Sequence, residues 1–115
     1  MVADKAHMVL TRNFKDHVAA KIKADPKFRQ ALLQEAVQTL ISGDAQTARA
    51  VLRDYINATI GFAALSKATG TPPKSLMRMF GPQGNPTAAN LFGVIAALQK
   101  KTGVRLEVRV ISSAA

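Results

Sequence analysis

Cysteine is absent from the 115-residue chain. Its absence excludes disulfide bridges, zinc ribbons and thiol nucleophiles. The chain also lacks the run of about 18 apolar residues that a membrane-spanning helix needs, since its nearest approach, Ala88 to Leu98, is shorter and contains Asn90. The N-terminal stretch has neither the apolar core nor the small-residue cleavage site of a signal peptide. We therefore expect a soluble cytoplasmic protein.

Acidic residues are scarce, above all after residue 60. Residues 1–60 contain nine bases and six acids, whereas residues 61–115 contain seven bases and Glu107 as the only acid. The formal net charge of the whole chain is +9. A cationic surface suits a polyanion such as nucleic acid or an anionic membrane, although some small proteins are basic without binding either. The charge therefore directs the search for a binding site to the second half.

Apolar residues make up 48% of the chain, which argues against intrinsic disorder. In the first half they recur at helical spacing. A helix that begins after Thr11 should stop at Asp25-Pro26, where Asp25 caps the next helix; Gly43 ends that helix, and Asp44 caps a third. The apolar stripes of these three helices are Phe14, Val18 and Ile22; Phe28, Leu32, Leu33, Val37, Leu40 and Ile41; and Ala48, Leu52, Tyr55, Ile56 and Thr59.

The second half predicts three further helices. Two short ones, over 62–69 and 72–80, flank a break at Gly70-Thr71 and are followed by a loop of turn-forming residues over 81–86. Thr87 is expected to cap a last helix, which Gly103 ends. The residues of this helix that should face inward are Leu91, Val94, Ile95 and Leu98.

The tail over 104–110 alternates apolar and charged residues, which is typical of a half-buried strand. Its apolar members are Val104, Leu106, Val108 and Val110. Nothing else in the chain predicts a strand that could pair with it, so we expect it to pair with a second copy or a partner.

The chain is thus expected to form an all-α bundle of about six helices with one short C-terminal β-strand that pairs between molecules. The expected organisation is a flexible N-terminus over 1–10, a helical domain over 11–103 and a tail over 104–115.

The segment 62–80 fits a helix-turn-helix. Ser66 is small where the two helices would cross, and Gly70 can take the positive φ that the turn needs. Leu65, Leu76 and Met79 can hold the second helix on the first. That helix would expose Lys74, Ser75, Met77 and Arg78, which include no acid, and Thr71 would be its N-cap.

Three motifs carry a resemblance to a known family: Gly-Phe-Ala-Ala-Leu-Ser-Lys-Ala-Thr-Gly over 61–70, Lys-Ser-Leu-Met-Arg over 74–78, and Gly-Asn-Pro over 84–86. Together they resemble the HigA-like addiction-module antidotes, which are lambda-repressor-like helix-turn-helix regulators. The resemblance implies a DNA-binding domain that dimerises on an operator and pairs with a small RelE-like ribonuclease toxin. The chain departs from many relatives at Pro72-Pro73, where they have Ser-Arg, and in its long tail.

The resemblance also implies two sets of DNA-binding residues. The recognition residues would be Thr71, Pro73, Lys74, Ser75, Met77 and Arg78, and the residues on backbone phosphate would be Gly84, Asn85 and Thr87. Asn85 serves the turn equally well, Met77 can be a core residue instead, and Lys100 and Lys101 suit the negative end of a helix.

Catalysis and metal binding are poorly supported. His7 and His17 are ten residues apart, and neither stands at the i, i+4 spacing that places two imidazoles on one metal. Asp16 and Asp54 have no carboxylate partner nearby in sequence, and the loop over 81–86 lacks the Gly-Lys-Ser/Thr ending of a phosphate-binding loop. We expect no enzymatic activity, no metal and no cofactor.

The expected function is that of a homodimeric transcriptional regulator, with the helix over 72–80 in the major groove. Two such helices would suit an inverted repeat with half-sites about 34 Å apart. The sequence leaves open an antitoxin that represses its own promoter, a stand-alone repressor without a toxin, and an interaction module with a degenerate helix-turn-helix.

Overall fold

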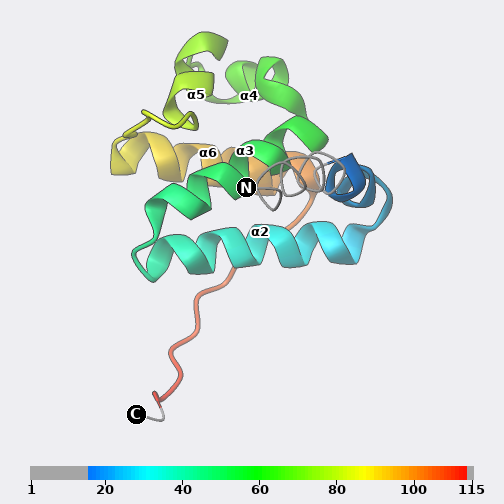
Figure 1. The fold of residues 1–115 in the computed structure, drawn as a ribbon, viewed down its shortest axis with the longest axis vertical. Coiled ribbons are helices and arrows are strands. Elements are labelled where there is room, and N and C mark those ends of the chain that lie inside the picture. Colours follow the sequence, from blue (N-terminus) through cyan, green and yellow to red (C-terminus); the bar gives the residue numbers. More distant parts are fainter. Residues whose placement is uncertain (1–15, 114–115) are drawn as a thin grey trace, which may run out of the picture.

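A computed structural model describes residues 16–113 of the chain. A helical segment over 16–24 precedes five helices (Figure 1). These are α2 (Pro26–Ile41), α3 (Ala45–Ala58), α4 (Gly61–Thr69), α5 (Pro73–Met79) and α6 (Ala88–Thr102). The predicted all-α class is therefore confirmed. The expected N-terminal segment 1–10 and the helix start at Thr11 and Phe14 lie outside the described residues, as does His7.

Local sequence signals explain where the longer helices begin. The Asp25 carboxylate accepts hydrogen bonds from the backbone N–H groups of Lys27 and Phe28, at 3.0 and 3.2 Å. Asp44 accepts one from the N–H of Thr47 at 3.1 Å, and hydrogen bonds from Thr47 hold the pKa of Asp44 below its ordinary value. Thr87 likewise accepts from the N–H of Asn90, at 3.2 Å, so three of the four predicted caps are confirmed.

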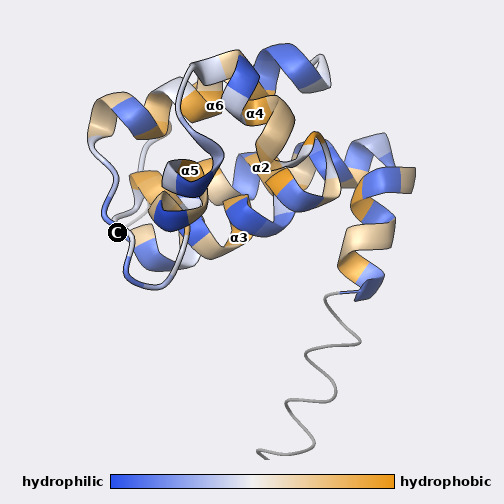
Figure 2. Cartoon of the chain, turned by 90° about the horizontal axis from the view of Figure 1, so that it is seen from above, coloured by the Kyte–Doolittle hydropathy of each residue, from blue (hydrophilic) through white to orange (hydrophobic). Residues whose placement is uncertain are grey.

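The helices pack in sequence around one apolar core. α2 packs against α3, α3 against α4, and α4 against both α5 and α6. Figure 2 shows polar and apolar residues alternating along the helices, as expected for helices with one buried face. The largest fully buried side chains are Tyr55, Phe80, Ile22, Leu33, Leu52, Ile56, Leu65, Leu76, Leu98 and Val94. Most of the predicted stripe residues therefore form the core.

Among residues 16–113, Tyr55 is the one fully buried side chain that carries a polar group at its end. Its hydroxyl lies 3.3 Å from Oγ1 of Thr102, so it joins the middle of the bundle to the last turn of α6. No sequence signal marked this pair, because the two residues lie 47 positions apart.

The C-terminal tail is where the structure departs from the sequence-based expectation. The expectation of a strand over 104–110 is wrong for the single chain: residues 104–113 have no regular secondary structure. Val104 and Leu106 are half-buried against the core, while Val108 and Val110 are exposed. Figure 1 shows the tail passing α2 and leaving the bundle. A strand needs a neighbouring strand for its backbone hydrogen bonds, and the described residues supply none.

Within residues 16–113, none of the helices has the length and apolar character needed to cross a bilayer.

Candidate nucleic-acid interface

The turn between α4 and α5 is built on Gly70. Its φ is +77°, as predicted, which is a conformation that side chains with a Cβ rarely adopt. The Gly70 N–H donates to the carbonyl of Ser66 at 2.8 Å and so closes α4. Oγ1 of Thr69 donates to the carbonyl of Leu65 at 2.9 Å and accepts the N–H of Thr71 at 3.3 Å. These bonds give α4 a sharp and well-connected end.

Apolar contacts hold α5 against α4. Leu65 and Leu76 are fully buried, and Met79 packs against the core, so the predicted clamp is present. The rings of Phe62 and Phe80 lie 6.3 Å apart, centre to centre, with their planes tilted by 50°. Such aromatic pairs stabilise by about 0.5–1.5 kcal/mol beyond their buried area. These contacts hold the C-terminal half of α5 against α4.

Thr71 does not cap α5, contrary to the prediction. The N-cap is Pro72, with φ −57° and ψ 145°, and no side chain caps the helix. The cause is the Pro72-Pro73 pair: a proline disfavours the helical conformation in the residue before it, so the helix cannot begin before Pro73. Thr71 lies in the turn, half-buried.

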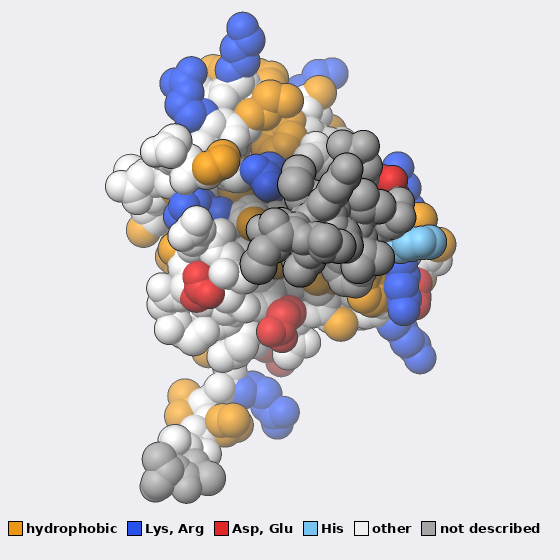
Figure 3. Space-filling view, viewed as in Figure 1, with side chains coloured by type: hydrophobic (Ala, Val, Ile, Leu, Met, Phe, Trp, Pro, Cys, Tyr) orange, Lys and Arg blue, Asp and Glu red, His pale blue; other side chains and the backbone are white. Residues whose placement is uncertain are grey.

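The solvent face of α5 is cationic. Lys74 and Arg78 are exposed and one helical turn apart, and Met77 beside them is 53% exposed, so its side chain faces solvent and is not a core residue. Pro73 is exposed, whereas Ser75 is half-buried. Figure 3 shows Lys and Arg side chains protruding at the end of the molecule formed by α4 and α5.

No acid offsets these cations. The segment between Asp54 and Glu107 contains no acidic residue and six cations, namely Lys67, Lys74, Arg78, Lys100, Lys101 and Arg105. The helix-turn-helix unit therefore presents a surface to which a polyanion is attracted without local repulsion.

The loop after α5 folds back beside the same cations. With Arg78 and the first turn of α6, the loop lines a hollow of about 240 Å³. Five of the nine predicted DNA-binding residues meet there, namely Ser75, Arg78, Gly84, Asn85 and Thr87. Thr71, Pro73, Lys74 and Met77 do not line it.

Gly84 has a role that sequence reasoning missed. A Cβ at this position would overlap the backbone of Met79, and it would come within 2.5 Å of the Arg78 carbonyl oxygen. Its N–H donates to the carbonyl of Gly81 at 3.0 Å. Glycine is needed here because the loop passes directly over the end of α5. The Gly-Asn-Pro motif was the sequence signal that could have suggested this need for glycine.

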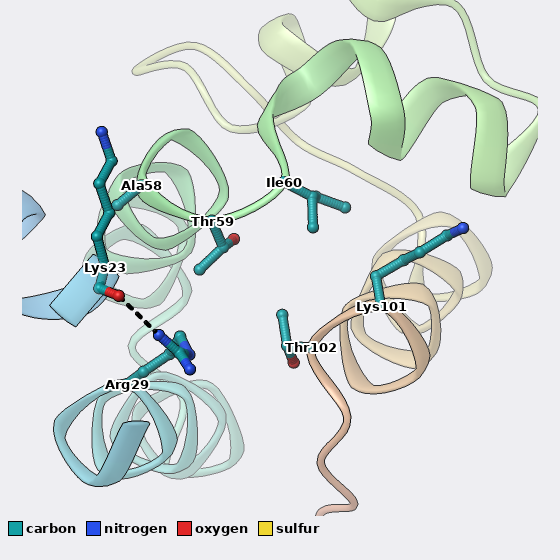
Figure 4. A pocket seen from close by; sticks show the side chains of 7 residues that line it. All are labelled: Lys23, Arg29, Ala58, Thr59, Ile60, Lys101 and Thr102. Atoms are coloured by element: carbon teal, nitrogen blue, oxygen red, sulfur yellow. Dashed lines mark hydrogen bonds between the residues drawn. The ribbon is translucent and has the colours of Figure 1, made fainter. Parts of the chain in front are cut away.

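A second hollow, of about 370 Å³, lies where several helices end (Figure 4). Lys23, Arg29 and Lys101 line it with no acid among the lining residues. Nη1 of Arg29 donates to the carbonyls of Ile22 and Lys23, at 2.7 and 3.3 Å. Cations are favoured at the negative ends of helices, and Figure 4 shows both lysine side chains extending away from the hollow. These residues therefore have a structural explanation.

No metal centre is formed by the described residues. Among residues 16–113, no three His, Asp or Glu side chains lie close enough together to hold a metal ion. His17, Asp16 and Asp54 therefore form no such group.

No protein-family model matches the chain, and neither a curated protein nor a solved structure is significantly similar to it.

Proposed function

We propose that the protein is a sequence-specific DNA-binding transcriptional regulator. The observation that supports this most is the acid-free surface of the α4–α5 unit. On it, Lys74 and Arg78 project from one face of a helix that Gly70 and the apolar clamp hold in a fixed orientation. An exposed helix of this kind fits the major groove, which admits one α-helix.

The roles of the side chains follow from their chemistry. Arg78 suits the O6 and N7 acceptors of guanine, which an arginine can contact with two hydrogen bonds. Met77 suits the methyl group of a thymine. Lys74 and Ser75, and on the loop side Asn85 and Thr87, suit phosphate oxygens.

In this proposal the protein acts as the antitoxin and autorepressor of a toxin–antitoxin module, in line with its resemblance to HigA-like antidotes. The protein would then be a homodimer that also binds a RelE-like ribonuclease toxin, with Val104, Leu106, Val108 and Val110 forming a strand between molecules. A stand-alone repressor uses the same surface without a toxin. The neighbouring gene distinguishes the two.

A second candidate is a protein-interaction module whose helix-turn-helix no longer binds DNA. The exposed apolar tail favours it, because such a segment suits a protein partner.

An electrophoretic mobility shift on the DNA upstream of its own coding sequence tests the proposal. Binding should weaken with a log–log salt slope of several units, since phosphate contacts release counterions. Arg78→Ala should cost about 1–3 kcal/mol of specific binding. Lys101→Ala is the matched control: it removes the same charge at the far end of α6, where the proposal places no DNA, and it should have little effect.

The two variants separate the possible outcomes. Absence of a shift at low salt would rule out the regulator and leave the interaction module. Equal losses for Arg78→Ala and Lys101→Ala, or equal binding to every duplex, would mean that the protein holds DNA only through its overall charge.

A further inference from the structure

The tail leaves the bundle with an unusual amount of exposed apolar surface. Val108, Val110 and Ile111 are 79%, 98% and 84% exposed. The segment before them is held: the Val104 N–H donates to the Gln99 carbonyl at 3.0 Å, and the Leu106 N–H to Oε1 of Gln99 at 2.8 Å. The exposed residues therefore begin at a fixed point on the bundle.

A groove of about 290 Å³ runs between α2 and the tail. Val37 and Ile41 line it from α2, and Leu106 and Val108 line it from the tail. Ile41 is 58% exposed, although it belongs to the apolar stripe of α2. Gln34 and Gln38 of α2 and Glu107 and Arg109 of the tail complete the lining, so the groove joins the exposed apolar side chains of the tail within a partly polar surface.

We propose that a second copy of the chain covers this surface, with the two tails paired as antiparallel strands centred on Val108. It rests on the strand between molecules in the proposed function and gives that strand a register, and it does not require DNA binding. In this register Val108 faces the partner's Val108, and Leu106 faces the partner's Val110. Glu107 faces the partner's Arg109, and by symmetry the opposite pair forms as well. Opposite charges placed directly across a strand pair stabilise it.

Charge and core packing together select this register over its alternatives. Centring the pair on Glu107 would place Glu107 opposite itself and Arg105 opposite the partner's Arg109. A parallel in-register pair would place every charge opposite its own copy, and like charges across a pair destabilise it. Centring it on Leu106 would also place opposite charges across the pair, Arg105 opposite the partner's Glu107, but it would draw in Val104, which already packs on the core and donates to the Gln99 carbonyl. The Arg105–Glu107 ion pair, 2.9 Å long and exposed, already lies on the charged face of an extended segment.

Because the chain has no cysteine, single cysteines can measure the register. Val108→Cys places the new thiol opposite its own copy, with Cα atoms about 4.5–5.5 Å apart, which is within disulfide range. Val110→Cys is the matched control: its two copies lie four residues apart along the ribbon, about 14 Å, which is too far for a disulfide. Both positions are exposed, so neither change threatens the fold.

Mild oxidation followed by non-reducing electrophoresis should give covalent dimers of Val108→Cys at least about tenfold faster than of Val110→Cys. Light scattering of the wild type should give the mass of a dimer. Arg109→Glu should raise the dimer dissociation constant about tenfold, since two like-charged pairs replace two opposite ones, and Glu107→Arg combined with Arg109→Glu should restore it.

Each contrary result overturns the pairing. Equal crosslinking of the two cysteine variants would show random collisions of tails. A dimer that neither variant crosslinks would use another surface. A monomeric wild type would leave the groove to a different protein, such as a toxin. A double variant as weak as Arg109→Glu would exclude the proposed register.

Discussion

Replacing Gly84 with alanine tests the packing of the loop on α5. The new Cβ would come within 2.5 Å of the Arg78 carbonyl oxygen and overlap the backbone at Met79, whereas real Cβ atoms essentially never approach closer than 3.0 Å. The obstructing atoms are backbone, so no side chain can rotate away. The loop must therefore lift by at least 0.5 Å or the end of α5 must deform. Overpacking of this kind costs about 1–3 kcal/mol.

Gly93→Ala is the matched control for Gly84→Ala. Gly93 lies inside α6, and a Cβ there meets nothing within 4 Å. Alanine should stabilise this position by about 0.5–1 kcal/mol, because glycine is the poorer helix former. Both variants lower the entropy of the unfolded chain alike, so the difference between them isolates the steric clash.

Urea unfolding followed by circular dichroism measures both variants. The free energies of unfolding should differ by about 1.5–4 kcal/mol, with Gly84→Ala below the wild type and Gly93→Ala above it. In thermal unfolding, Gly84→Ala should lower Tm by roughly 4–12 °C. If Gly84→Ala proved as stable as Gly93→Ala, the loop would not lie against α5 as described.

Two further changes probe the cap of α3 and the anchor of the tail. Hydrogen bonds from Thr47 lower the pKa of Asp44 from 3.8, so the stability that this carboxylate contributes is present above pH 3.8 and is lost as the pH falls through the lowered pKa. The difference in unfolding free energy between the wild type and Asp44→Asn should therefore shrink in acid. A difference that stays constant with pH would contradict this. Gln99→Ala removes the acceptor of the Leu106 N–H, so hydrogen exchange at that amide should accelerate while the free energy of global unfolding changes little. An unchanged exchange rate would show that the hydrogen bond to Gln99 does not hold the tail.

Features that depend on neighbours in sequence could be predicted. Asp25, Asp44 and Thr87 cap helices through N–H groups two or three residues away, and Gly70 takes the turn conformation for reasons within its own backbone. The prediction that Thr71 caps α5 was wrong, although the cause is also local. The restriction that Pro73 imposes on the backbone of Pro72 outweighed the preference of threonine for N-cap positions.

Features that depend on distant segments could not be predicted. The resemblance to HigA-like antidotes implied phosphate contact for Gly84, but the need for glycine there comes from the path of the loop over α5. Arg29 and Gln99 carry no signal of the carbonyl and the amide that they bind, which lie seven residues away. The alternation over 104–110 predicted a strand that the structure does not show, because the hydrogen bonds of a strand belong to a pair of segments and the chain provides only one.

The proposed tail pairing determines where two copies of α5 would lie. Figure 1 shows α5 and the far end of the tail at opposite ends of the molecule. Two antiparallel strands are related by a twofold axis perpendicular to them, so the second copy is inverted along the direction of the tail. Its α5 then lies beyond the ribbon and faces the other way. Half-sites about 34 Å apart on one duplex need both helices on one face, which this dimer does not offer.

A tail-paired dimer should therefore hold two duplexes at once. An immobilised duplex carrying the binding sequence should retain a second, fluorescent copy when the wild-type protein is added. Arg109→Glu should lose this retention but still bind a single duplex, because it weakens the ribbon and leaves Lys74 and Arg78 in place. Arg78→Ala should lose both, whereas Lys101→Ala should keep both. A wild-type footprint with two protected half-sites one helical turn apart on a single duplex, lost in Arg109→Glu, would place both α5 helices on one face and refute the antiparallel ribbon.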